Sequence, residues 1–506
     1  MNFTGLYEHL LLGFTVALSL QNLWYCFVGC FLGTLIGVLP GIGPVATIAM
    51  LLPITFNLPP TPALIMLAGI YYGASYGGST TAILVNLPGE SSSVVTMLDG
   101  YQMGRQGRAG PALAIAALGS FFAGCVGTVL IALFGPPLAE LAFEFGAAEY
   151  FSMMALGLIS AVVLASGSLI KAIGMIFVGL LMGIVGTDVN SGIARYSFGV
   201  SELSDGIGFV SVAMGMFGFG EIISNLELSA IERHVAVSKV ASLMPTLNDI
   251  KMSVGPIIRA TTIGVIFGIL PGAHTVIASF SSYTMEKKLA RDPKRFGRGA
   301  IEGVAGPEAA NNAAAQTAFI PLLTLGIPTG AVMALMVGAM TIQGIAPGPQ
   351  VMTQKPDLFW GMIASMWIGN LMLVILNLPL IGMWVQFLKI PYRLLFPGIC
   401  LFCCIGAYSV NNASFDVYVV AVYGLFGYYC SKWGCEPAPL ILGFVLGPLM
   451  EENLRRAMLI SRGDPMVFLT RPISLGMLLV AAALLCMVIA PQLRKKRAEV
   501  ITEADT

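Results

Sequence analysis

The chain has 506 residues, of which 57% are hydrophobic and only 10% are charged. Soluble domains use charged residues for roughly 25% of their positions, so the composition excludes an ordinary water-soluble fold. The 26 basic residues balance the 26 acidic ones, and zero net charge gives no overall field that would attract nucleic acid. The composition therefore indicates a protein whose surroundings are the lipid bilayer.

Long apolar runs begin near the N-terminus and recur to the end of the chain. Residues 9–89 contain no Asp, Glu, Lys or Arg, and five further charge-free runs cover 111–139, 309–354, 358–388, 394–415 and 473–493. Continuous runs are typical of membrane helices, whereas β-barrel strands alternate in hydrophobicity. Since one crossing takes about 20 apolar residues, we expect an all-α polytopic membrane protein with about 12 transmembrane segments.

Sequence motifs of the first half of the chain recur in the second half, which predicts that the two halves are homologous. GTLIGVLPG at 33–41 and GVIFGILPG at 264–272 share a Gly-x-x-x-Gly-x-Leu-Pro-Gly pattern at a displacement of 231 residues. Pro88 in VNLPGE corresponds to Pro328 in LGIPTG at a displacement of 240, and the charged segment 286–298 accounts for the longer spacing. Transporters are often built from such repeats, and we favour an inverted arrangement.

These patterns predict the division of the chain. An N-terminal interfacial or first-helix segment covers 1–20, the repeats cover 20–225 and 255–490, a polar segment at 226–254 connects them, and a charged tail covers 491–506. Cytoplasmic loops carry an excess of Lys and Arg. Segment 286–298 has six basic residues against two acidic ones, and Arg494–Arg497 is wholly basic, so both are expected in the cytoplasm.

Pro and Gly interrupt the apolar runs at corresponding places in the two halves. The interruptions are Pro40-Gly41, Pro88-Gly89, Pro271-Gly272 and Pro328-Thr329-Gly330. Any one of them could be a turn at the membrane surface. Their symmetric recurrence instead favours broken or re-entrant helices at the centre, because irregular backbone at membrane depth must be buried in protein or line a polar cavity.

Polar residues gather beside these breaks and are the candidate ligands. Helix ends exposed at a break offer amides to an anion and carbonyls to a cation, and hydroxyl and amide side chains supplement both. Each serine or threonine alone could be a helix cap or a contact between helices. The predicted substrate-binding residues are Ser79, Thr80, Thr81, Pro88, Gly89, Ser91, Ser92, Asn311, Asn312, Gln316, Pro328 and Thr329. The predicted cation-binding residues are Gly41, Gly43, Gly272 and Asn311, with no metal site beyond one for Na⁺.

The remaining ionisable groups give a weaker signal. Glu308, Glu221 and Asp416 lie in or near apolar runs, where an acid at membrane depth would be functional and one at a loop end would not. His274 has no counterpart in the first half and is interpreted as a packed or cavity-edge residue. Three scattered histidines, with no nucleotide-binding, metalloprotease or serine-hydrolase motif, predict that the chain is not an enzyme and has no cofactor.

Several longer sequence motifs resemble those of a known family. They are GVLPGIGP at 37–44, YYGASYGGSTTAILVNLPGE at 71–90, LDGYQMGRQGRAGPAL at 98–113, GILPG at 268–272, NNAAAQTAFIPLLTLGIPTG at 311–330 and GIAPGPQ at 344–350. Together they resemble the large membrane subunit of bacterial tripartite tricarboxylate transporters over nearly the whole chain. The motifs typical of the family coincide with the breaks described above. They lie around Gly41, Ser79 and Pro88 in the first half and around Asn311 and Pro328 in the second.

The resemblance implies a secondary transporter in the bacterial inner membrane. It would work with a small four-helix membrane subunit and a periplasmic solute-binding protein, and would import citrate-like tricarboxylates or related carboxylates with Na⁺ or H⁺ as coupling ion. We therefore expect cation-coupled, binding-protein-dependent alternating access. A passive channel or an integral membrane enzyme acting on a small polar substrate is the alternative.

Overall fold

We describe the protein from a computed structural model. The structure describes residues 3–39, 41–164, 168–188, 191–227, 243–270, 274–388, 390 and 392–487. Pro40, the Pro271-Gly272 break and the tail 491–506 therefore lie outside the described residues, as does the side chain of His274. The predicted cation ligand Gly272 falls among them.

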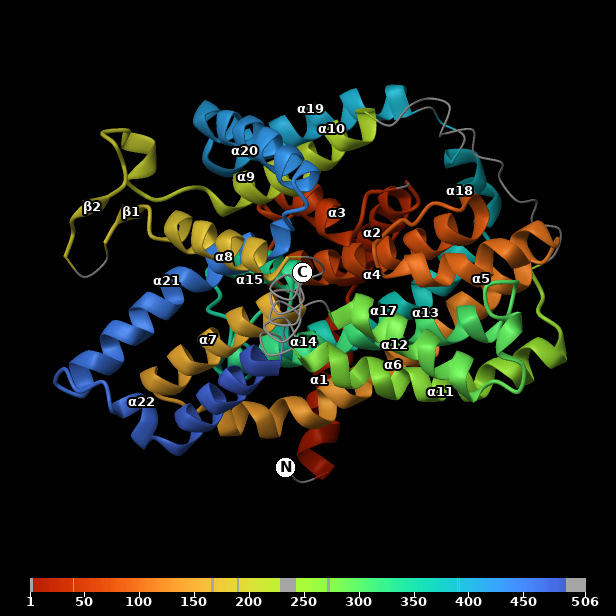
Figure 1. Ribbon diagram of the computed structural model, residues 1–506, viewed down its shortest axis with the longest axis horizontal. Coiled ribbons are helices and arrows are strands. Elements are labelled where there is room, and N and C mark those ends of the chain that lie inside the picture. The colour runs from red at the N-terminus through yellow and green to blue at the C-terminus, as the bar shows by residue number, and fades with distance from the viewer. Residues whose placement is uncertain are drawn as a thin grey trace, which may run out of the picture. The chain divides into compact units, whose positions relative to one another are not determined.

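The fold is almost entirely helical, as predicted, and divides into two compact units (Figure 1). The first unit comprises residues 1–142, 208–270 and 274–433. Its α-helices up to the polar connection are α1 (Phe3–Ala17), α2 (Leu20–Gly37), α3 (Pro44–Leu51), α4 (Pro60–Val85), α5 (Ser93–Arg105), α6 (Ala109–Ala142), α9 (Phe209–Ala213) and α10 (Gly220–Glu227). Those after it are α11 (Leu247–Ile269), α12 (His274–Leu289), α13 (Glu302–Thr317), α14 (Phe319–Leu325), α15 (Ala331–Ile342), α16 (Gln350–Gln354), α17 (Pro356–Asn377), α18 (Ile381–Phe387), α19 (Tyr392–Asn411) and α20 (Ser414–Lys432).

Short non-α segments complete the first unit. They are the 3₁₀ turns η1 (Leu52–Thr55) and η4 (Pro293–Arg295) and the π-helical segment η3 (Met214–Phe219). The helix α11 begins at Leu247, ahead of residue 255 where the second repeat is expected to start. Thr246 and Asp249 form a capping box there, which satisfies amides that the first helical turn leaves unpaired.

The second unit comprises the described residues of 143–207 and 434–487. Its elements are α7 (Ala147–Leu164), α8 (Leu169–Gly183), β1 (Gly186–Thr187), β2 (Ala194–Arg195), η2 (Ser201–Leu203), α21 (Pro437–Ile460) and α22 (Val467–Thr470). The strands β1 and β2 pair antiparallel, with Gly186 opposite Arg195. Buried Glu149 on α7 accepts a hydrogen bond of 2.5 Å from Arg471, which ties the two parts of this unit together across the sequence.

Five helical stretches among the described residues are long and apolar enough to cross a membrane. They are Leu20–Gly37, Ala109–Ala142, Phe209–Glu227, Leu247–Ile269 and Pro356–Asn377. Shorter apolar helices accompany them, among them Pro44–Thr55, Leu169–Gly183 and Ala331–Ile342. This is the pattern of a polytopic membrane protein with interrupted helices, and the number of crossings stays a prediction.

Glycines bring α2 and α4 into backbone contact, and Figure 1 shows the two helices side by side. A Cβ on Gly33 would lie 2.3 Å from the carbonyl oxygen of Ile70, and one on Gly37 would lie 2.4 Å from that of Ala74. Real Cβ atoms do not approach so closely, so only glycine fits. Small residues four apart are the usual means of close helix packing in membranes.

The same contact recurs between α11 and α13. A Cβ on Gly264 would lie 2.3 Å from the carbonyl oxygen of Ala310, and one on Gly268 would lie 2.5 Å from that of Ala314. These glycines stand 231 residues after Gly33 and Gly37, and the two alanines stand 240 residues after Ile70 and Ala74, which are the displacements of the sequence motifs. The recurrence is what a duplication predicts, although the direction of the repeats stays a prediction.

The ends of α5 and α15 repeat in the same way. Gly107 and Gly344 follow these helices with φ of +78° and +70°. One residue later, the amides of Arg108 and Ile345 donate to the carbonyls of Met103 and Met340, each at 2.8 Å. A left-handed residue that closes a helix through a bond back to the preceding turn favours glycine, so the shared Gln-Gly sequence has a structural reason in both halves.

Asp99 on α5 fixes the turn that precedes α13. Its side chain is fully buried, and Oδ2 accepts a hydrogen bond of 3.0 Å from the Tyr283 hydroxyl. Oδ1 accepts backbone N–H groups at 2.8–2.9 Å from Gly297, Gly299 and Ala300. Bonds to an ionised acceptor are the strong ones, so this carboxylate holds the end of the basic segment 286–298 and sets where α13 starts.

The glycine contacts predict a stability difference between two conservative substitutions. Gly33→Ala forces α2 away from α4 and should lower the free energy of unfolding by about 1–3 kcal/mol, as overpacking does. Gly174→Ala is the matched control, because a Cβ there meets nothing within 4 Å. Thermal unfolding of the purified protein in detergent measures both, and equal midpoints for the two variants would contradict the close packing.

Loss of the Asp99 carboxylate should release the turn before α13. Each hydrogen bond to a charged group contributes about 1.5–3 kcal/mol, so Asp99→Ala should accelerate tryptic cleavage after Arg295 or Arg298 by about tenfold or more. Asp205→Ala removes an exposed carboxylate and should leave the rate unchanged. Cleavage of both variants at the wild-type rate would show that Asp99 does not hold this turn.

Candidate functional site

The two breaks of the first half meet in space. The amide of Gly41, with φ of +81°, donates to the carbonyl of Pro88 at 3.4 Å. Gly89 lies against Gly78 of α4, where a Cβ would come within 2.2 Å of the Gly78 Cα. The predicted residues Gly41, Pro88 and Gly89 therefore form one structural unit between α2, α3, α4 and α5.

The second break directs Glu90 toward α13. Asn311 Nδ2 donates to Glu90 Oε1 at 2.7 Å. Gly43, at the start of α3, lies close by, since its Cβ position is 3.7 Å from the Cβ of Glu90. The Oδ1 of Asn311 and the hydroxyl of Ser92 are buried without a hydrogen-bond partner among the described residues. Residues from both predicted halves thus share one polar cluster.

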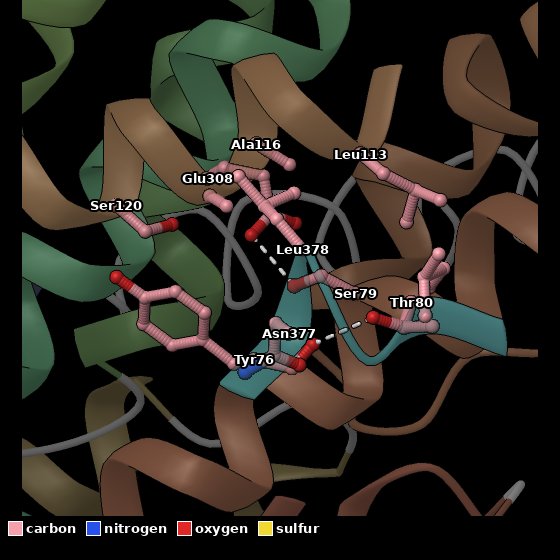
Figure 2. Close-up of a pocket in the computed structure, with 11 residues that line it drawn as sticks. Tyr76, Ser79, Thr80, Leu113, Ala116, Ser120, Glu308, Asn377 and Leu378 are labelled. Carbon is pink, nitrogen blue, oxygen red and sulfur yellow. Dashed lines mark hydrogen bonds between the residues drawn. The ribbon is translucent and has the colours of Figure 1, made fainter. Parts of the chain in front are cut away.

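Glu308 is the centre of a second polar cluster and is only 1% exposed. Figure 2 shows its carboxylate facing Ser79, whose hydroxyl donates to Oε2 at 2.6 Å. Thr96 donates to Oε1 at 2.6 Å. A buried carboxylate is tolerated only when it is hydrogen-bonded, so this group ties α4, α5 and α13 together.

A small cavity of about 10 Å³ opens beside Glu308. Its walls come from α4, α6, α13 and the end of α17 (Figure 2). The polar lining residues are Tyr76, Ser79, Thr80, Ser120, Glu308 and Asn377. The hydroxyl of Tyr76 and the Oδ1 of Asn377 are buried without a hydrogen-bond partner among the described residues.

Two predicted substrate ligands, Asn312 and Gln316, hold helices together in this structure, and their role as ligands stays a prediction. Asn312 donates to the Ser120 hydroxyl at 2.7 Å and to the Glu308 carbonyl at 3.0 Å, and Gln316 donates to the Thr128 hydroxyl at 2.7 Å. Both bonds to hydroxyls join α13 to α6. Polar contacts of this kind are common between membrane helices, and the cost of burying an amide explains why both side chains are bonded.

The other predicted substrate ligands have varied surroundings. Thr81 is bonded to the carbonyls of Val38 and Gly77, Thr80 reaches the carbonyl of Tyr76 in its own helix, and Ser91 is exposed. Pro328 and Thr329 are buried in the connection between α14 and α15. Within the described part of the chain, no hydrogen bond joins Pro328 or Thr329 to Glu90 or Glu308.

The other ionisable candidates are also placed. Glu221 and Asn225 of α10 lie beside Gly41, at 3.0–3.4 Å from its Cβ position. Asp416 accepts hydrogen bonds from Ser211 and Asn411 at 2.9 and 3.0 Å. The basic residue Arg259 of α11, which the sequence alone does not mark as a candidate, donates two hydrogen bonds to Glu286 at 2.9 and 2.6 Å and so is paired with an acid.

Sequence reasoning left Glu90, Tyr76, Thr96, Ser120 and Asn377 out of the predicted ligands, and it gave Glu308 only the weaker signal of an ionisable group. Glu90 had a signal, because it ends the long charge-free run of residues 9–89 directly after a break. Tyr76 lies one helical turn from Ser79, and this spacing could have drawn attention to it. Thr96 and Asn377 gave no such signal, since their relation to Glu308 depends on packing between distant helices.

Comparisons with known proteins agree with this architecture. The tripartite tricarboxylate transporter TctA family model matches residues 23–442. An uncharacterized 52.8 kDa protein of the TAR-I ttuC′ 3′ region of Agrobacterium vitis is 61% identical over 500 residues, which cover 99% of each chain. An uncharacterized protein of the TAR-II ttuC′ 3′ region of the same organism is 63% identical over 244 residues, 48% of this chain and all of that protein.

No solved structure matches the chain. The family match extends over most of the sequence and includes both polar clusters, from the first break through α17. The chain therefore belongs to the tripartite tricarboxylate transporter TctA family, and it is a multi-pass membrane protein that forms a component of such a transporter.

Proposed function

We propose that the chain is the subunit of a secondary active transporter that carries tricarboxylates or related small carboxylates through the membrane with a coupling cation. Transport depends on a periplasmic solute-binding protein, which delivers the ligand, and on a small membrane subunit. The membrane is the bacterial inner membrane, with segment 286–298 and the C-terminal tail in the cytoplasm. These assignments follow the family and the distribution of Lys and Arg.

The observation that supports this function best is the joining of the two halves through polar groups in an otherwise apolar interior. The break at Pro88-Gly89 places Glu90 against Asn311, and α4 places Ser79 against Glu308. Burial of so many polar groups is costly, and at such depth they usually mark a path for a solute or ion. An alternating-access carrier needs such a site between elements that can move.

The charge of the two clusters gives a physical reason for coupling. Glu90 and Glu308 both accept hydrogen bonds from neutral side chains, and the ion pairs of the described residues include neither of them. A carboxylate substrate entering this region meets like charge at low dielectric, which disfavours binding. A cation bound with the substrate removes that repulsion, so each ligand favours binding of the other.

Asn311 is the residue we expect to matter most for transport, because its Nδ2 donates to Glu90 and its Oδ1 has no hydrogen-bond partner among the described residues. Asn311→Ala removes a bond to a charged group, worth about 1.5–3 kcal/mol, and should lower the initial uptake rate by about tenfold or more. Asn453→Ala is the matched control, because the hydrogen bond of its amide within the described part of the chain goes to the Leu449 carbonyl of its own helix. If the Asn311→Ala variant takes up substrate at the wild-type rate, Asn311 does not contribute to transport.

The measurement is uptake of labelled citrate by proteoliposomes that contain this chain, the small membrane subunit and the binding protein. We expect accumulation only with the binding protein present and with an inward Na⁺ gradient. Uptake that equilibrates without accumulating, whatever the gradient, would contradict the proposal and favour a passive channel. If citrate is not taken up but another small carboxylate is taken up in a gradient-dependent way, the proposal of a carrier stands and the proposed substrate is wrong.

A further inference from the structure

The cavity beside Glu308 has the size of a single small particle. Its volume of about 10 Å³ is close to the minimum that holds one water molecule. A tricarboxylate does not fit into a space of this size, so the cavity suits a smaller particle than the transported anion. The side chains at the wall, rather than its volume, indicate the chemistry of that occupant.

Several polar atoms of the lining residues are oxygens that can act as acceptors. Glu308 contributes a carboxylate that is only 1% exposed. The Asn377 Oδ1 and the Tyr76 hydroxyl, in residues that are each 4% exposed, have no hydrogen-bond partner among the described residues. An unpartnered buried acceptor costs free energy, and a cation in the cavity would give such an oxygen a partner.

The charge at the cavity also calls for a cation. The ion pairs found in the described part of the chain do not include Glu308, whose two oxygens are held only by the neutral hydroxyls of Ser79 and Thr96. A buried carboxyl group is compensated by an opposite charge, by a bound metal ion or by uptake of a proton. Carboxylate, hydroxyl and amide oxygens together are the ligands of hard cations.

We propose that this cavity is the Na⁺ site of the transporter, with Glu308, Tyr76 and Asn377 as its side-chain ligands and the hydroxyls of Ser79 and Thr80 beside them. The proposal rests on the proposed cation-coupled function and gives it a location. That location differs from the one predicted from the helix breaks, at Gly41, Gly43, Gly272 and Asn311. The difference arises because cavity walls from α6 and α17 could not be foreseen from the motifs.

The location of the cavity on α13 explains how binding of Na⁺ could be coupled to binding of the carboxylate. Glu308 belongs to α13, and Asn311 on the same helix holds Glu90 beside the break at Pro88-Gly89. A cation at Glu308 therefore neutralises the region in which the anion would bind and draws together α4, α13 and the end of α17. Binding of Na⁺ then precedes or accompanies binding of the carboxylate.

The test uses the purified full chain and Na⁺ alone, with choline replacing Na⁺ at constant ionic strength. Binding of radioactive sodium and the shift of the thermal midpoint with Na⁺ concentration both report the dissociation constant, because a ligand that binds only the folded state stabilises it. The variants are Glu308→Gln and Tyr76→Phe. The second removes an oxygen that makes no hydrogen bond among the described residues, so the helix should fold normally.

We expect saturable Na⁺ binding by the wild type. In both variants the dissociation constant for Na⁺ should be at least tenfold larger. Tyr72→Phe makes the same change one turn earlier on α4, away from the cavity lining, and should stay within twofold of the wild type. Glu221→Gln makes the same change as Glu308→Gln but beside Gly41, and should also stay within twofold.

Other outcomes overturn the proposal in distinct ways. Loss of Na⁺ binding in Glu221→Gln with retention in Glu308→Gln would place the ion at the Gly41 break. No Na⁺ binding by the wild type, with uptake driven by a proton gradient and lost in Glu308→Gln, would make Glu308 a proton carrier instead. Na⁺ binding that behaves as expected, without carboxylate uptake in the complete transporter, would sustain the site and refute the proposed function.

Discussion

The structure depends on one constraint, which is that the Glu308 carboxylate is buried in a largely apolar interior. Such a group is stable only when every oxygen finds a donor or a cation. Ser79 and Thr96 provide the donors from α4 and α5, so the carboxylate fixes how the first predicted half meets the second. The same helix presents Asn311 to Glu90, which adds the break at Pro88-Gly89 to this junction.

Glycine packing makes that junction possible. The contacts of Gly33 with Ile70 and of Gly264 with Ala310 bring α2 against α4 and α11 against α13 at backbone distance, and the hydrogen bond from Ser79 to Glu308 joins α4 to α13. Asp99 then sets the start of α13 through the turn at 297–300. Stability and function are thus built from the same elements, because the residues that close the packing also place the polar clusters.

Much of this could be predicted from the sequence, and the limits have physical reasons. Charge-free runs predict a helical membrane protein because the bilayer leaves no alternative, and the resemblance to the transporter family is confirmed. The breaks predict the vicinity of Glu90 and Asn311, since both lie near Pro-Gly motifs. The separation of roles within α13 was not foreseen. Asn312 and Gln316 hold α6, whereas Glu308 lines a cavity, and only three-dimensional packing distinguishes three polar residues on one helix.

Coupled transport as proposed requires that the region around Ser79 and Glu308 closes when Na⁺ binds there and a carboxylate binds beside Glu90 and Asn311. Its most direct test is the rate at which a small thiol reagent modifies Ser79→Cys in membranes containing the complete transporter, read by mass spectrometry of the peptide that contains residue 79. We predict that Na⁺ with citrate slows modification much more than either alone, whereas exposed Ser91→Cys changes little. Equal rates at residue 79 under all four conditions would contradict the claim.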